Sequence, residues 1–171
     1  MHLLDLLSKS LLIPSLEASD AEGCIRNLTK VMVDEGCALP EYAEDVIRRE
    51  RTFPTGLPTE PIAVAIPHAD PDHLRRSCVA LGISARGIPF GQMGTDGDIQ
   101  VHARLIFLLG IREREKQVDM IGELMELIQN ESLLKSLTAA HDVESAWSVL
   151  GGQKNVRRSE EHTSELQSLV I

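Results

Sequence analysis

A short apolar run, Ile-Ala-Val-Ala-Ile at residues 62–66, ends at Pro67 and is followed directly by His68. The run is bounded upstream by Thr-Glu-Pro, and its length fits a buried strand better than a helix. His68 is therefore expected to leave a β-sheet at the carboxyl end of a strand. Ligand sites of open α/β sheets are usually built at that edge, and an imidazole there can carry protons or phosphoryl groups near neutral pH.

Helical and strand patterns are mixed along the rest of the chain. Helical spacing of apolar residues, a capping-box spacing at Ser19 and a proline at position 40 predict helices at residues 19–36, 40–53, 118–128 and 133–137, and from 142 onward. Apolar runs predict strands at 11–13, 62–66, 78–83 and 105–111, with loops at 55–61 and 85–98. We therefore expect a single α/β domain with a central mixed sheet flanked by helices.

Composition narrows the class of protein. A length of 171 residues and a hydrophobic content of 43% allow one well-buried core. No apolar stretch is long enough to cross a bilayer and the N-terminus lacks a secretory signal, so a cytoplasmic protein without membrane insertion is expected. The net charge of -9 argues against a nucleic-acid partner. Three cysteines without a C-x-x-C pair are expected to be buried reduced thiols: Cys24, Cys37 and Cys78.

The last residues are expected to be foreign to the domain, which we place at residues 1–157. The segment Arg-Ser-Glu-Glu-His-Thr-Ser-Glu-Leu-Gln-Ser, at 158–168, resembles the in-frame translation of a common sequencing adapter, so we set residues 158–171 aside as a non-native tail. His162 lies in this tail and is excluded from the candidate site. The native C-terminus is then unknown, and the native chain could continue into another domain.

His68 opens the sequence His-Ala-Asp-Pro-Asp-His, which admits a metal site. Two imidazoles and two carboxylates within six positions could bind zinc, and the order resembles the H-x-H-x-D-H motif of metallo-β-lactamase-type hydrolases. Asp70 stands where the second histidine of that motif belongs. A metal-dependent hydrolase using His68, Asp70 and His73 is therefore one hypothesis. Such hydrolases need further ligands downstream, where only His102 and His141 remain before the tail.

Phosphoryl transfer through a phosphohistidine is the alternative chemistry. A neutral imidazole can attack phosphorus, hold the group covalently and pass it to another nucleophile. No metal or cofactor is required if positive charge neutralises the phosphoryl oxygens. Arginine suits that task because its guanidinium stays charged and can bond two phosphate oxygens at once. Arg49, brought back toward His68 by the 55–61 loop, is the candidate charge partner.

The pattern Arg-Glu-x-x-x-Pro-Thr-Gly from Arg49, followed by Ile-Ala-x-Ala-Ile-Pro-His, resembles a known family. It is similar to the fructose/mannitol-type (type 2) enzyme IIA domain of the bacterial phosphoenolpyruvate-dependent sugar phosphotransferase system. The spacing from Arg49 to His68 and the following Asp-x-x-His resemble the galactitol-specific branch most. The likeness in layout extends from the N-terminal helix to about Leu150, so it covers nearly the whole expected domain.

The resemblance implies a function and its partners. His68 would accept a phosphoryl group from the histidine-containing phosphocarrier protein and deliver it to a cysteine of enzyme IIB, which works with the membrane enzyme IIC. The sugar would be galactitol or a related polyol. Arg49 matches the family arginine beside the active histidine, while Thr55 and Gly56 match its loop. A regulatory module that shares the fold and serves no sugar remains an alternative.

One position departs from the mannitol-type pattern. Those members carry a second histidine at the start of the helix after the third strand, whereas this chain has Gln117 there. Galactitol-type members resemble this chain at that point. An amide can donate a hydrogen bond but cannot titrate, so Gln117 is expected to make a supporting contact. The resemblance thus implies catalytic roles for His68 and Arg49, and supporting roles for Thr55, Gly56 and Gln117.

Overall fold

The computed structural model describes the backbone of residues 1–170 and the side chains of residues 1–161. Its strands are Leu12–Ile13 (β1), Gly56–Leu57 (β2), Val64–Ala65 (β3), Cys78–Gly91 (β4) and Gln100–Gly110 (β5). They form one sheet in the order β1-β4-β5-β3-β2. The β1/β4 and β3/β5 pairs are parallel, whereas the β4/β5 and β2/β3 pairs are antiparallel. The predicted mixed sheet is therefore confirmed.

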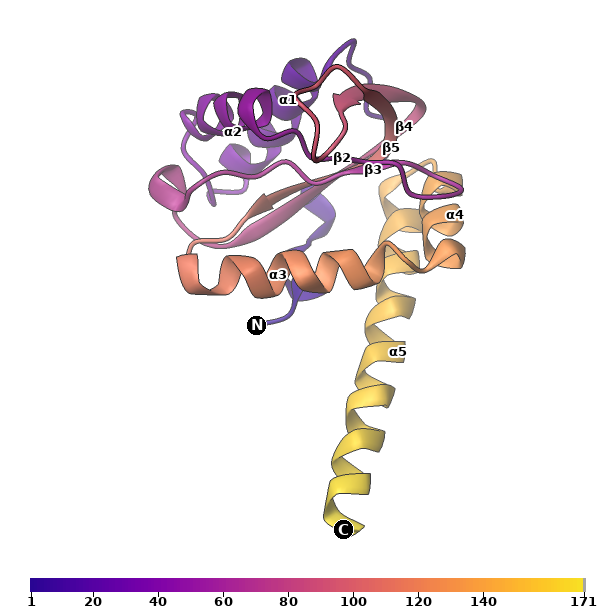
Figure 1. Ribbon diagram of the computed structural model, residues 1–171. Coiled ribbons are helices and arrows are strands. Elements are labelled where there is room, and N and C mark those ends of the chain that lie inside the picture. The colour runs from indigo at the N-terminus through magenta and orange to yellow at the C-terminus, as the bar shows by residue number, and fades with distance from the viewer. Residues whose placement is uncertain (171) are drawn as a thin grey trace.

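Helices cover both faces of this sheet. They are Ala21–Asp34 (α1), Tyr42–Thr52 (α2), Arg114–Leu127 (α3), Glu131–Ala139 (α4) and Val143–Val170 (α5), with short 3-10 turns at Leu3–Leu6, Lys9–Leu11 and Pro71–His73. Figure 1 shows α1 and α2 on one face, and α3, α4 and the start of α5 on the other, while the rest of α5 extends away from the body. Within residues 1–170, no helix is both long and apolar enough to cross a bilayer.

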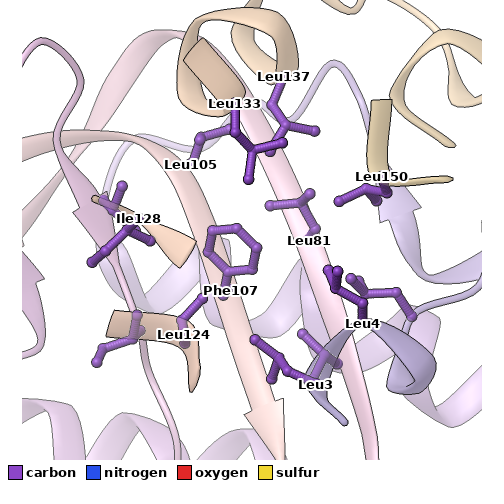
Figure 2. Close-up of a cluster of buried hydrophobic side chains, with 14 of the residues drawn as sticks. Leu3, Leu4, Leu81, Leu105, Phe107, Leu124, Ile128, Leu133, Leu137 and Leu150 are labelled. Atoms are coloured by element: carbon purple, nitrogen blue, oxygen red, sulfur yellow. The ribbon is translucent and has the colours of Figure 1, made fainter. Parts of the chain in front are cut away.

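The strand β5 explains why the core has two halves. Its side chains alternate, so Phe107 packs with α3, α4 and the start of α5, whereas Ile106 and Leu108 pack with α1 and α2. Figure 2 shows the first cluster, in which Phe107 lies among leucines and isoleucines from the sheet, the helices and the N-terminal turn. Each such side chain contributes about 1.5–3 kcal/mol when fully buried. Burial on both faces accounts for the unbroken apolar run at 105–109.

Several predicted boundaries were wrong for local reasons. The N-cap of α1 is Asp20 and not Ser19, because the Asp20 carboxylate accepts a 2.8 Å hydrogen bond from the Gly23 amide. Part of the predicted 85–98 loop belongs to β4, which continues through Gly91. The strand pairing shifts register between Ile83 and Ile88, and Gly87 adopts a positive φ of 82° there. The glycine that indicated a loop thus forms a bulge inside a longer strand.

The cysteines differ from the sequence-based expectation. Cys37 follows α1 and Cys78 begins β4, and the structure joins them in a disulfide with a Cα–Cα distance of 6.5 Å. The prediction of reduced thiols is therefore wrong for this pair. The two residues are 41 positions apart, so no local spacing indicated that the fold would bring them together. Cys24 is a free buried thiol, and burial raises its pKa to about 12.

Candidate functional site

His68 lies just beyond the carboxyl end of β3, as the sequence predicts. The Leu109 amide of β5 donates a 3.0 Å hydrogen bond to the Pro67 carbonyl, and His68 forms a parallel bridge with Leu109. Pairing with β5 therefore continues past the two residues of β3 and fixes the backbone of His68. The side chain is half-buried at this edge of the sheet.

The His68 ring is held in one tautomer. Its Nδ1 atom lies 2.8 Å from the carbonyl oxygen of Ile66. A carbonyl oxygen only accepts hydrogen bonds, so Nδ1 carries the proton and Nε2 carries the free lone pair. Burial lowers the pKa of His68 below its ordinary value, and the positive charge of Arg49 lowers it further against the opposing effects of Ile66 and Asp70. At neutral pH the ring is therefore uncharged, with Nε2 available as a nucleophile.

The peptide groups beside His68 are held by two side chains. The Tyr42 hydroxyl donates a 2.6 Å hydrogen bond to the Leu109 carbonyl and accepts a 3.3 Å bond from the Ala69 amide. The Gln117 side chain donates from Nε2 to the Ala69 carbonyl at 3.1 Å. Gln117 thus contacts the backbone next to His68. Tyr42 was not among the site residues expected from the sequence, although a buried tyrosine hydroxyl usually needs a partner.

Arg49 comes from the last turn of α2 and faces the same side as the loop after His68. Its guanidinium carbon lies 5.1 Å from the centroid of the Phe53 ring, a cation–π arrangement. A pocket of about 280 Å³ is lined by Arg49, Phe53, Ala69 and Asp70 among others. The fold therefore brings the arginine predicted from sequence to the segment that carries His68. Its side chain is exposed, so the charge is available to a ligand.

Thr55 and Gly56 support the site through the backbone. Thr55 is buried, and its carbonyl accepts a 3.3 Å hydrogen bond from the Ile66 amide. A Cβ atom added to Gly56 would lie only 2.6 Å from both the Gly91 carbonyl oxygen and a Val101 methyl group. Only glycine fits this close approach of β2 to its neighbours. The loop matched by the family pattern is thus part of the sheet that positions His68.

Glu50 is a buried acid that sequence analysis missed. It follows Arg49 on α2, is 8% exposed, and accepts hydrogen bonds from the amide and hydroxyl of Thr55. Burial raises its pKa to about 7, against the opposing effect of the Thr55 hydrogen bonds and the Arg49 charge. One signal was present in the sequence. Glu50 lies four and three positions after Val46 and Ile47, which places it on the apolar stripe of the helix.

The residues of the metal hypothesis do not come together. His73 Nδ1 lies 2.5 Å from a carboxylate oxygen of Asp45, and this contact raises the pKa of His73. Asp70 instead faces Arg114, with 3.6 Å between their charged atoms, and His68 is bonded to its own strand. Across residues 1–161, no three histidine, cysteine, aspartate or glutamate side chains form a group that could hold a metal ion. The geometry gives that hypothesis no support.

Comparison with known proteins agrees with the phosphoryl-transfer interpretation. The sequence model of the family described as "Phosphoenolpyruvate-dependent sugar phosphotransferase system, EIIA 2" matches residues 5–152. The galactitol-specific EIIA component of Escherichia coli strain K12 is 25% identical over 118 residues, which cover 69% of this chain and 77% of that protein.

Solved structures share the fold. The complex of enzyme IIAMTL and phosphorylated enzyme IIBMTL from Escherichia coli matches with a TM-score of 0.71 at 24% identity, over 85% of this chain and 97% of that chain. The nitrogen regulatory protein IIA-Ntr from Neisseria meningitidis matches with a TM-score of 0.69 at 20% identity, over 86% and 97% of the two chains. At these identities, the likeness concerns the fold alone.

Proposed function

This chain belongs to the EIIA 2 family of the phosphoenolpyruvate-dependent sugar phosphotransferase system, and on that premise we propose that it accepts a phosphoryl group on Nε2 of His68. Members of this family are phosphotransfer components, so a transferase role follows from membership. The observation that carries the finer proposal is the bond from His68 Nδ1 to the Ile66 carbonyl, because it leaves Nε2 as the nucleophilic atom.

The transfer needs no proton to leave His68. The Nε2 lone pair forms the new bond to phosphorus while the donor's P–N bond breaks, and that electron pair returns to the donor nitrogen. Positive charge develops on the His68 ring as the new bond forms. The Ile66 carbonyl, which accepts from Nδ1, stabilises that charge. Delivery to a thiolate reverses these events and restores the neutral ring.

Arg49 supplies the positive charge of the proposed site. The phosphoryl oxygens carry negative charge through the transfer, and a guanidinium can bond two of them. Arg49 is exposed, and the pocket that it lines reaches Ala69, the residue after His68. The nearby Phe53 ring holds the guanidinium from one side. Electrostatic stabilisation by a fixed charge is then the main catalytic contribution of the chain.

The proposed partners are those that the family resemblance implies. The donor is the histidine-containing phosphocarrier protein, and the acceptor is a cysteine of an enzyme IIB that works with a membrane enzyme IIC. The similarity of this fold to a IIA chain solved with phosphorylated enzyme IIBMTL supports the IIB proposal. Galactitol or a related polyol is the proposed sugar, on the strength of the galactitol-specific relative.

A labelling experiment tests this function. Purified chain is incubated with labelled phosphoenolpyruvate, enzyme I and the phosphocarrier. We expect an acid-labile label on the wild type and on His102→Ala, a control histidine on β5, and none on His68→Ala. Equal labelling of His68→Ala would refute the proposal. Addition of a galactitol enzyme IIB should then discharge the label, whereas a label that no IIB removes would favour the regulatory alternative.

A further inference from the structure

The proposed transfer chemistry leaves the carboxyl group of Glu50 unused. This side chain is 8% exposed, and its two oxygens accept hydrogen bonds from the Thr55 amide at 2.8 Å and the Thr55 hydroxyl at 2.9 Å. Burying a carboxyl group costs free energy even when it is hydrogen-bonded. An apolar side chain of similar volume is often at least as stabilising at such a position. Packing alone therefore does not explain an acid there.

The Glu50 carboxyl is connected to the His68 ring by consecutive hydrogen bonds. Thr55, which donates to Glu50, accepts a 3.3 Å bond at its carbonyl from the Ile66 amide. The Ile66 carbonyl in turn accepts the 2.8 Å bond from His68 Nδ1. Thr55 directly precedes β2 and Ile66 directly follows β3, and the two strands pair antiparallel with Gly56 opposite Ala65. A shift of Thr55 would thus move the carbonyl that orients the ring.

The same carboxyl group fixes the end of α2. Arg49 precedes Glu50 in the last turn, and the Arg49 carbonyl accepts a 2.7 Å hydrogen bond from the Phe53 amide. The contact between Glu50 and Thr55 closes the turn that contains Phe53, against which the Arg49 guanidinium lies. The positions of the Arg49 guanidinium and of the His68 ring therefore both depend on the buried carboxyl group of Glu50.

We propose that Glu50 is a positioning residue for phosphoryl transfer. Through its hydrogen bonds to Thr55, it holds the Arg49 guanidinium and His68 Nε2 in the relative positions that the transfer requires. The inference rests on the proposed function. Glu50 acts through its neighbours and does not touch the phosphoryl group. A carboxylate accepts both hydrogen bonds from Thr55, while a protonated acid accepts from the amide and donates to the hydroxyl oxygen. The contact between Glu50 and Thr55 is therefore kept in either protonation state.

Three variants test this role. Glu50→Leu fills a similar volume without the Thr55 bonds, and we expect transfer to His68 to slow by about tenfold to a hundredfold in the folded protein. Glu50→Gln can accept from the amide and donate to the hydroxyl oxygen of Thr55, so it should restore most of the rate. Thr29→Ala removes another buried hydroxyl, on α1 and outside the path, and should leave the rate unchanged.

A second readout does not require the phosphoryl donor. Nitrogen-15 NMR of the His68 ring should show the Nδ1–H tautomer in the wild type and in Glu50→Gln, but a mixture of tautomers in Glu50→Leu. A Glu50→Leu protein with wild-type rate and ring spectrum would overturn the inference. If Glu50→Leu fails to fold, Glu50→Met, which also lacks both Thr55 bonds, is measured in its place, and a wild-type rate and ring spectrum there would also overturn the inference. A wild-type protein that accepts no phosphoryl label would refute the proposed function. The ring spectra would still test whether Glu50 orients the His68 ring through Thr55.

Discussion

The Nδ1 atom of His68 donates a hydrogen bond to the carbonyl of Ile66, two residues earlier in the chain and 2.8 Å away. Because this backbone carbonyl holds the proton on Nδ1, Nε2 is left as the reactive nitrogen. Neither a neighbouring carboxylate nor a metal is needed to set the tautomer. The sheet edge therefore supplies both the position and the chemical state of the imidazole.

The rate of phosphoryl transfer should depend on pH through His68. Protonation places a proton on Nε2 and blocks attack, so the rate is lost as pH falls through the pKa of His68. Burial and Arg49 lower that pKa, so the midpoint of the acid limb should lie below the ordinary value of about 6.5. Rate–pH profiles and an NMR titration of the ring measure it, and a midpoint above 6.5 would contradict the site described.

Removal of the Arg49 charge should reduce transfer strongly. We expect Arg49→Gln to lower the rate by about a hundredfold, since a donor aimed at transition-state charge is lost. Arg51→Gln is the matched control, because it removes the same charge from the same helix end. Arg51 lies 3.1 Å from Glu22 in an exposed ion pair, and its loss should change the rate little. Equal losses in both variants would mean that only general surface charge matters.

The same Arg49→Gln variant carries a second expectation. Loss of the positive charge should raise the pKa of His68 toward its ordinary value, because Arg49 is one cause of its depression. An NMR titration of the ring in this variant and in Arg51→Gln separates the two arginines. An unchanged His68 pKa in Arg49→Gln would place the guanidinium too far away to act on the phosphoryl group.

Tyr42→Phe should destabilise the protein. The hydroxyl bonds both the Leu109 carbonyl and the Ala69 amide, and its removal leaves buried polar groups unpaired at a cost of about 1–3 kcal/mol. Urea unfolding of the variant and the wild type measures this difference. Identical unfolding midpoints would show that the hydroxyl does not hold the two segments together.

Deletion of residues 158–171 should leave the domain intact, in line with our proposal that it lies within residues 1–157. The family match ends at 152, and α5 extends away from the body beyond it (Figure 1). Glu161 contacts His2 and Arg157, but exposed ion pairs contribute at most about 1 kcal/mol. Urea unfolding and the labelling assay check this, and a loss of folding would show that the tail belongs to the domain. His162 of the tail lies outside the residues whose side chains are described.

The sequence predicted those features that depend on local pattern. The apolar run before Pro67 placed His68 at a strand end, and the resemblance to the family pattern that contains both Arg49 and His68 indicated a common site. The pattern could not show which atoms of the ring would be bonded, because the Ile66 carbonyl is a backbone group without a sequence signature. Long-range partners were also missed, because no local spacing indicates them, and the disulfide between Cys37 and Cys78, 41 positions apart, is an example.

Strand β2 and the extension of β4 show a second limit. Proline and glycine at residues 55–61 and glycines at residues 85–98 predicted loops. Tertiary pairing overrides that local preference, because Gly56 fits against Gly91 only without a side chain. Glu50 was similarly hidden, since an acid in a charged helix end resembles a solvated residue until Thr55 is seen to cover it.

Phosphorus-31 and nitrogen-15 NMR of the phosphorylated chain tests the central claim most directly. The protein is labelled with nitrogen-15 in its histidine rings and phosphorylated by phosphoenolpyruvate, enzyme I and the phosphocarrier. We predict a single phosphohistidine whose phosphorus couples to Nε2 of His68, with the proton still on Nδ1. A phosphoryl group on Nδ1, or on a residue other than His68, would contradict the account.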